Sequence, residues 1–244
     1  MKIFWFLPNI LTFTNLFFGC IGIVYGINGD LKTLSICVLF GCICDFFDGF
    51  FARLFNVNSS LGTQLDSFSD LVTFGLSSSV VMFNLMLNSD FVTTSNSESN
   101  FLNYLPFFSF LIVIASSYRL AKFNMQRKTN YFYGLPTPAN AIFIVFLPYL
   151  FEHQLMESIN YIINNTLFLI ILVLISSMLL ISNFEMPKFK GGKTSKTFNI
   201  RREFFILISI VLISLLKFAA FPIVILIYLV FGLVFMNYIK ANIT

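Results

Sequence analysis

Charged residues are scarce in this chain, since only 11% of its 244 residues are Asp, Glu, Lys or Arg. Soluble domains carry about 25% charged residues, whereas 57% of the residues here are hydrophobic. This composition excludes a cytosolic globular enzyme and a disordered chain. The net charge of +4 comes from 15 basic and 11 acidic residues and is too small and too scattered for a nucleic-acid-binding surface. We therefore expect a membrane protein with no nucleic-acid partner.

Residues that bind zinc are also few. The only histidine, His153, falls in an expected outer loop, where it is a poor catalytic candidate. Four cysteines lie within apolar runs and have no zinc-ligand spacing: Cys20, Cys37, Cys42 and Cys44. Because cysteine is a common small core residue, we expect these four to have structural roles.

Long apolar runs dominate the sequence. A helix needs about 20 mainly apolar residues to cross a bilayer. Eight stretches reach or approach this length: residues 10–28, 32–55, 62–88, 102–123, 137–151, 165–183, 203–218 and 220–239. The sequence therefore predicts an all-α integral membrane protein with about eight transmembrane helices. No soluble domain or internal repeat is visible, so residues 1–244 are expected to form a single membrane domain.

The distribution of basic residues predicts the orientation. If both termini are cytoplasmic, only Lys32 and Lys217 of the 15 basic residues lie on the outer side, which leaves 13 on the inner side. This bias follows the positive-inside rule. Lys188 and Lys190 on the inner side are expected to meet anionic lipid head groups. The predicted location is a cell inner membrane or cytoplasmic membrane, crossed several times.

Four aspartates lie within or at the ends of two apolar spans: Asp45, Asp48, Asp66 and Asp70. An ionised carboxylate in a span costs roughly 2.5–3.5 kcal/mol, so such residues usually serve a function. The spacings i, i+3 and i, i+4 place each pair on one helix face. Because the link between the two spans is short, the pairs are expected to face each other at the cytoplasmic surface. Oxygen ligands without histidine or cysteine suit Mg²⁺ or Mn²⁺.

The charge pattern alone leaves a second interpretation open. Carboxylates in membrane spans also form proton relays and ion pathways. A cation-coupled transporter is therefore an alternative to a metal-dependent enzyme at this point.

The residues between the aspartates favour the enzyme. Residues 45–70 fit the pattern D-x2-D-G-x2-A-R-x8-G-x3-D-x3-D, which fixes eight positions: Asp45, Asp48, Gly49, Ala52, Arg53, Gly62, Asp66 and Asp70. This segment resembles the signature of the CDP-alcohol phosphatidyltransferase family. The resemblance implies that an alcohol hydroxyl attacks the lipid-linked phosphate of a CDP-lipid and that CMP leaves. It also implies a homodimer.

The same resemblance implies roles for these residues. Asp45, Asp48, Asp66 and Asp70 would hold two divalent cations, Asp66 and Asp70 would be the catalytic carboxylates, and Asp70 would be the general base. Gly49 and Gly62 would let the nucleotide approach the helices closely, Ala52 would leave room beside them, and Arg53 would hold phosphate.

Four further segments resemble the membrane-integrated phosphatidylserine synthases within this family. They are Pro8-Asn9-x-x-Thr12-x-x-Asn15-x-x-x-Gly19, then residues 119–124 (RLAKFN), 132–139 (FYGLPTPA) and 182–190 (SNFEMPKFK). The first implies that Asn9 and Thr12 contact the CDP-lipid. The family-like region covers residues 1–190, and residues 203–240 are expected to add two C-terminal transmembrane helices.

This second resemblance implies CDP-diacylglycerol and L-serine as substrates. Arg119 or Lys122 would hold the serine carboxylate, and Asn124 would help orient the ligand. Glycerol 3-phosphate or an inositol phosphate remains open as the acceptor. The sequence departs from the pattern at Lys122, where arginine is frequent, and after Gly75, where a proline often follows; the latter leaves the shape of the third span open.

Overall fold

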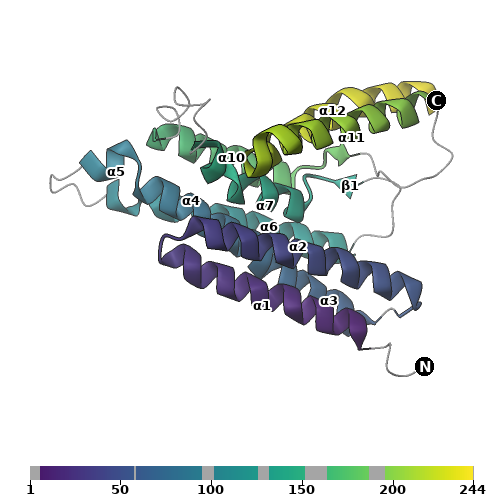
Figure 1. Ribbon diagram of the computed structural model, residues 1–244, viewed down its shortest axis with the longest axis horizontal. Coiled ribbons are helices and arrows are strands. Elements are labelled where there is room, and N and C mark those ends of the chain that lie inside the picture. Colours follow the sequence, from purple (N-terminus) through teal and green to yellow (C-terminus); the bar gives the residue numbers. More distant parts are fainter. Residues whose placement is uncertain are drawn as a thin grey trace.

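The computed structural model describes residues 6–57, 59–94, 102–125, 132–151, 164–186 and 196–243. The helices form an elongated molecule in which the start of α1 and the end of α12 lie at the same end (Figure 1).

The first two helices, α1 (Leu7–Ile27) and α2 (Leu31–Leu54), form a tight antiparallel hairpin. Gly29 lies in the turn with φ +84°, a conformation that suits glycine. Asp30 then caps α2, since its side chain accepts hydrogen bonds from the backbone N–H (3.0 Å) and the hydroxyl (2.6 Å) of Thr33. These bonds hold the pKa of Asp30 below its ordinary value.

The third span consists of three helical pieces: α3 (Ser60–Asp70), the π-helical segment η2 (Leu71–Leu76) and α4 (Ser77–Leu87). Ser59 caps α3, because its hydroxyl accepts a hydrogen bond from the N–H of Gly62 at 2.9 Å. The π-helical segment begins directly after Asp70 and contains Gly75, and the departure from the family pattern follows at Ser77 and Ser78, in the first turn of α4. Such segments often occur at functional sites.

A short helix and a fourth long segment follow: α5 (Asp90–Thr94), the 3-10 helix η3 (Leu102–Phe110) and α6 (Leu111–Met125). Next come α7 (Thr137–Val145), α8 (Leu147–Phe151) and α10 (Thr166–Ile181). The α6 helix packs against α10 and against η2, so it borders the third span on the side away from α2.

The two strands, β1 (Phe132–Tyr133) and β2 (Glu185–Met186), are antiparallel, with Phe132 opposite Met186. Gly134 follows β1 with φ +72°, and a Cβ there would lie 2.8 Å from the carbonyl oxygen of Leu180. Its N–H donates to the carbonyl of Phe184 at 2.7 Å. The pairing therefore joins two segments that the sequence singled out separately, residues 132–139 and 182–190.

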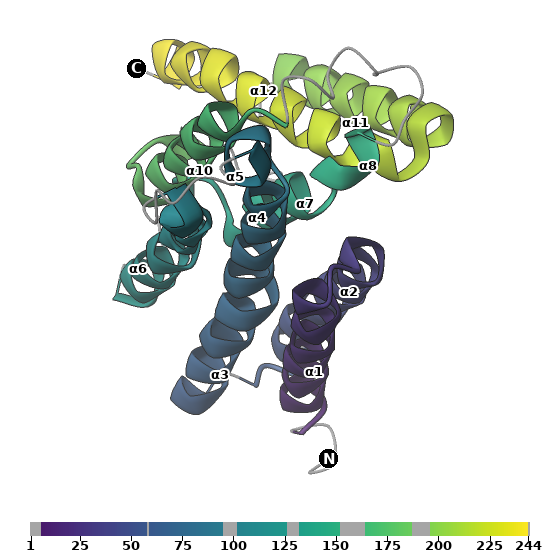
Figure 2. The same cartoon turned by 90° about the vertical axis from the view of Figure 1, so that its left-hand side faces the viewer.

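The C-terminal segment is a helical hairpin of α11 (Lys196–Leu216), the short 3-10 helix η5 (Lys217–Ala219) and α12 (Ala220–Ile243). Lys217 has φ +51° at the turn. The rings of Phe205 and Phe231 lie 5.8 Å apart, which confirms that the two helices run back along each other. Figure 2 shows this hairpin lying across α7, α8 and α10.

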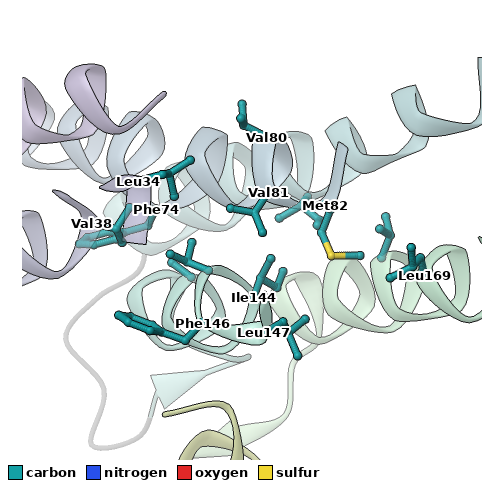
Figure 3. Packing of buried hydrophobic residues seen from close by; sticks show 14 of the residues in the cluster. Leu34, Val38, Phe74, Val80, Val81, Met82, Ile144, Phe146, Leu147 and Leu169 are labelled. Carbon is teal, nitrogen blue, oxygen red and sulfur yellow. The ribbon is translucent and has the colours of Figure 1, made fainter. Parts of the chain in front are cut away.

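The apolar core lies where α2, α4, α7, α8 and α10 meet (Figure 3). Leu34, Val38 and Phe74 pack on one side of it and Val81, Met82 and Ile144 continue it. The outer surface is also apolar, with large side chains exposed along the helices, whereas many buried residues are Ser, Thr or Asn. This arrangement suits a bilayer, in which lipid covers the outside and polar side chains pair within the bundle.

Five stretches are long and apolar enough to cross a membrane: Leu7–Ile27, Leu31–Leu54, Ser60–Leu87, Asn103–Met125 and Glu203–Gly232. Residues 137–150 and 166–181 form shorter apolar helices. The structure thus confirms a multi-pass helical protein. Within the described residues the count of eight spans is not confirmed, because α7 and α10 are shorter than a full span, whereas η5 divides the last stretch into two helices as predicted.

Candidate active site

Three carboxylates converge between the end of α2 and the start of the third span. One oxygen each of Asp45, Asp48 and Asp66 lies within 4.8 Å of the others. The α1 helix packs against both α2 and α3, and the i, i+3 spacing places Asp45 and Asp48 on one face of α2, where their side chains reach that of Asp66. The two faces that the sequence predicted to meet are therefore together.

Asp70 lies one helical turn beyond Asp66, deeper in the protein. Its side chain is 8% exposed, and its Oδ1 is buried without a hydrogen-bond partner. It also interacts with Asp45 across the gap between the third span and α2. A buried carboxylate oxygen without a partner is costly, so a ligand, a cation or a transferable proton is expected beside Asp70.

The first helix supports one of the carboxylates. Thr12 is buried, and its hydroxyl lies 2.6 Å from Oδ2 of Asp48 and 3.0 Å from the carbonyl oxygen of Pro8. The backbone of Thr12 is fixed in turn by Ser69, whose hydroxyl donates to the Thr12 carbonyl at 3.0 Å. Residues of α1 and α3 thus hold the α2 carboxylate in place.

A cavity of about 120 Å³ opens beside the carboxylates. Its lining combines the ends of α1 and α2 with the start of α3: Pro8, Asn9, Thr12, Asp48, Gly49, Ala52, Val57, Ser59, Gly62, Thr63 and Asp66. Five residues that the sequence assigned to the CDP-lipid line it, namely Asn9, Thr12, Gly49, Ala52 and Gly62.

The two glycines of the cavity differ in their surroundings. A Cβ on Gly49 would meet nothing within 4 Å, so this position faces open space in the cavity. A Cβ on Gly62 would lie 2.9 Å from the hydroxyl oxygen of Ser59 and 3.3 Å from Oδ1 of Asn9. Gly49 therefore leaves room for a ligand, whereas Gly62 leaves room for the protein's own polar side chains.

Arg53 is not brought to the cavity. It is exposed in the last turn of α2 and is not among the residues that line the cavity. Its predicted contact with phosphate stays a prediction.

The three residues expected to bind the acceptor all lie on α6, in different surroundings. The Nη1 of Arg119 donates to the hydroxyl of Thr137 at 2.7 Å, and Arg119 interacts with Asp70. The Nζ of Lys122 donates to Oδ1 of Asn183 at 2.6 Å, and the Nδ2 of Asn124 donates to the hydroxyl of Ser67 at 2.8 Å. Of the two cations, Arg119 is thus the one whose charge interacts with that of Asp70.

Sequence reasoning missed several polar residues near the site. Ser59 and Thr63 line the cavity, and Thr137 holds Arg119. The signal for Ser59 and Thr63 was their position on both sides of Gly62, at the start of a span. Thr137 lies within residues 132–139, a segment that was noted only for its resemblance.

The donor set fits a hard divalent cation. All three converging side chains are carboxylates, which Mg²⁺, Mn²⁺ and Ca²⁺ prefer over the nitrogen and sulfur ligands of zinc sites. A cation would also relieve the repulsion between negative charges held within 4.8 Å of one another. The cluster therefore has the composition and the spacing of a metal site next to a cavity.

Comparisons with known proteins agree on one family. A family model described as CDP-alcohol phosphatidyltransferase matches residues 5–177. A CDP-diacylglycerol–serine O-phosphatidyltransferase from Helicobacter pylori (strain ATCC 700392 / 26695) is 29% identical over 232 residues, which cover 93% of this chain and 89% of the relative.

Two other relatives come from distant organisms. A CDP-diacylglycerol–serine O-phosphatidyltransferase from Bacillus subtilis (strain 168) is 29% identical over 190 residues, 76% of this chain and 92% of the relative. An archaetidylserine synthase from Methanothermobacter thermautotrophicus is 28% identical over 142 residues, 57% of this chain and 55% of the relative.

Proposed function

The chain belongs to the CDP-alcohol phosphatidyltransferase family, and we propose that it transfers the phosphatidyl group of CDP-diacylglycerol to the hydroxyl of L-serine. The products are phosphatidylserine and CMP. The observation that carries the proposal is the convergence of Asp45, Asp48 and Asp66 beside a cavity, with the buried Asp70 next to them. The names of the relatives support serine over another alcohol as the acceptor.

The aspartates in this proposal hold two divalent cations, Mg²⁺ or Mn²⁺. When bound, such cations neutralise the pyrophosphate and stabilise the departing CMP as Lewis acids. Asp45, Asp48 and Asp66 hold them, and Thr12 keeps Asp48 in position through its 2.6 Å hydrogen bond. Asp70 contributes a ligand oxygen or, as proposed next, accepts a proton.

Asp70 is the proposed general base. The serine hydroxyl must lose its proton as the oxygen bonds to phosphorus, and a nearby carboxylate can accept it. The oxygen Oδ1 of Asp70 is buried and has no hydrogen-bond partner, so it is available for this proton. Asp66, one turn earlier on α3, completes the pair of catalytic carboxylates.

The remaining residues bind the two substrates. Asn9, Gly49, Ala52 and Gly62 line the space proposed for the nucleotide part of the CDP-lipid. Arg119 is proposed to hold the serine carboxylate with its planar guanidinium. Lys122 and Asn124 lie further along α6, where they are tied to Asn183 and Ser67.

The proposed setting is the cytoplasmic membrane, with both termini and the site on the cytoplasmic side. Figure 1 shows the start of α1, the end of α2 and the end of α12 at one end of the molecule. Lys32 lies in the first turn of α2 and Lys217 in η5 between α11 and α12, and Figure 1 shows the start of α2 and the turn between α11 and α12 away from that end. This distribution supports the positive-inside orientation. The proposal includes a homodimer, which light scattering of the purified protein measures.

Release of CMP from CDP-diacylglycerol tests the function. The purified protein in detergent with Mg²⁺ or Mn²⁺ is given L-serine, glycerol 3-phosphate or an inositol phosphate, and CMP is measured for each. We expect release with L-serine well above that with the other alcohols. Equal release with another alcohol would refute serine as the acceptor, and no release with any alcohol would favour a transporter.

A further inference from the structure

A groove runs between α6 and α10, which lie side by side at the edge of the bundle (Figure 2). Small residues form its floor, since Ala115 and Ser177 line it and are at most 9% exposed. Large apolar side chains stand at its sides, where Ile114 is 62% exposed and Met178 is 73% exposed. The groove has a volume of about 470 Å³ and a mostly apolar lining. It therefore offers the bilayer a channel rather than a smooth helical surface.

The groove continues into a recess that is lined by two basic residues. Ile181 and Ser182 line both the groove and the recess, and Arg119 and Lys122 line the recess from α6. The recess has a volume of about 10 Å³, which is room for roughly one oxygen atom of a ligand that lies at its mouth. The groove thus has an apolar length and a positively charged end.

Lys122 is held at this charged end by its neighbours. Its Nζ donates to Oδ1 of Asn183 at 2.6 Å and lies 5.9 Å from the ring centre of Tyr118. An ammonium group has three donors, and the described residues use one of them in a hydrogen bond. Arg119 lines the recess as well, but its Nη1 donates to Thr137 at the start of α7. Lys122 is therefore the residue with donors for an anion at the mouth of the recess.

The length of the groove matches one leaflet of a bilayer. The lining of the groove and the recess extends along α6 from Leu111 to Lys122. At a rise of about 1.5 Å per residue, this length is about 16 Å. Half of a hydrocarbon core about 30 Å thick is about 15 Å. Lys122 lies in the last turn of α6, at the end of the membrane-crossing stretch Asn103–Met125, which places it at the level of lipid head groups.

We propose that the groove between α6 and α10 binds one anionic phospholipid of the surrounding bilayer, with an acyl chain in the apolar groove and a phosphate oxygen at Lys122. A phospholipid has the layout that the groove requires, since a charged phosphate lies at one end of apolar chains about one leaflet long. An anionic head group is favoured because a zwitterionic one would bring a further positive charge close to Arg119 and Lys122. The site is separate from the cavity beside the aspartates, which lies between α1, α2 and α3.

Native mass spectrometry of the delipidated protein in detergent tests the site. Phosphatidylglycerol is titrated onto the protein, with phosphatidylcholine of the same acyl chains as the zwitterionic comparison. A basic residue beside an anionic head group contributes about fivefold to binding, so we expect Lys122→Ala to weaken binding of the first phosphatidylglycerol about fivefold. Ile114→Trp places an indole in the groove and should weaken it at least as much. The matched controls are Lys217→Ala, in η5, and Leu207→Trp, at an exposed position of α11, and both should bind as the wild-type protein does.

Three results would overturn the inference. The first is equal affinity for phosphatidylglycerol in Lys122→Ala and the wild-type protein, and the second is equal affinity for the two lipids in the wild-type protein. The third is a wild-type dimer that Ile114→Trp converts into a monomer in light scattering, because a second copy of the chain would then occupy the groove. If Ile114→Trp lowers the melting temperature in detergent, Met178→Trp fills the groove from the α10 side instead and should weaken lipid binding in the same way.

Discussion

The hydroxyl of Thr12 on α1 lies 2.6 Å from Oδ2 of Asp48 on α2. This distance is shorter than the 3.0 Å to the carbonyl oxygen of Pro8, and the acceptor is a carboxylate, so the hydroxyl proton belongs on the bond to Asp48. Thr12 therefore orients a proposed metal ligand rather than serving only to pack α1 against α2. Mutation of such a supporting group often lowers metal affinity or activity substantially, even though the group does not contact the metal.

Replacing Thr12 by valine tests this support. Loss of a group that orients a metal ligand typically costs 10–100-fold in metal affinity. We expect Thr12→Val to shift the Mg²⁺ or Mn²⁺ concentration for half-maximal activity upward by about 10-fold or more. Thr14→Val is the control, because Thr14 bonds only to the carbonyl of Ile10 on the same helix. Identical metal titrations for Thr12→Val and the wild-type protein would show that Thr12 does not support the ligand.

Removal of the metal should abolish turnover. Three carboxylates within 4.8 Å of one another need a cation to hold the pyrophosphate of the substrate, which is itself negatively charged. EDTA should reduce CMP release to background, and added Mg²⁺ or Mn²⁺ should restore it. Full activity in metal-free buffer would contradict the assignment of Asp45, Asp48 and Asp66 as metal ligands.

Asp70→Asn should impair chemistry more than binding. A general base typically contributes 10²–10⁴-fold to the rate, and the amide keeps the size of the buried side chain. We expect kcat to fall by at least about 100-fold while CDP-diacylglycerol still binds, as measured by titration calorimetry in detergent. Asp48→Asn should instead weaken metal and CDP-lipid binding together. Wild-type turnover by Asp70→Asn would exclude Asp70 as the base.

Alanine substitutions of Arg119 and Lys122 should have very different effects on the KM for L-serine. Arg119 interacts with the buried Asp70, whereas Lys122 is occupied by Asn183 and lies 5.9 Å from the ring centre of Tyr118. We expect Arg119→Ala to raise the KM for L-serine at least about 10-fold with little change in the KM for CDP-diacylglycerol. Lys122→Ala should change either KM by less than about threefold. The reverse result would move the serine carboxylate to Lys122, and a rise of both KM values for Arg119→Ala would indicate a phosphate-binding or structural role.

Two glycines should respond to alanine in opposite ways. The added methyl of Gly49→Ala projects into the open cavity and should raise the KM for CDP-diacylglycerol without lowering the melting temperature in detergent. The methyl of Gly19→Ala would lie 2.9 Å from Cα of Thr73 on η2, and overpacking of this kind costs about 1–3 kcal/mol. Gly19→Ala should therefore lower the melting temperature, whereas Cys20→Ala on the exposed side of α1 should not. A destabilised Gly49→Ala would show that this glycine serves packing instead.

Much of the architecture followed from local sequence. The helices begin and end close to the predicted limits, as for Leu7–Ile27 against 10–28 and Leu31–Leu54 against 32–55. Helical spacing alone placed Asp45 and Asp48 on one face of α2, and the short link of residues 55–59 keeps the start of α3 close enough for Asp66 to reach them, although α3 itself packs against α1. These features depend on interactions between residues near each other in the chain, which periodicity and composition report directly.

The span count was less well predicted. Apolar length made residues 137–151 and 165–183 look like full spans, but α7 with α8 and α10 are shorter helices packed among their neighbours. Hydropathy measures only whether a segment tolerates lipid, and a helix buried against other helices satisfies the same measure. The β1–β2 pairing was missed for a related reason, since a two-residue strand has no periodicity to detect.

The sequence by itself determined the family, the helical membrane class and the identity of the four site aspartates. Each of these follows from residue types and their spacing along the chain. Only the tertiary structure decided which groups meet: Thr12 with Asp48, Arg119 with Thr137, and Asn124 with Ser67. The physical reason is that these pairs join helices far apart in the chain. Their contacts depend on the depth and rotation of each helix relative to its neighbours, which residue types and spacings along a single helix do not determine.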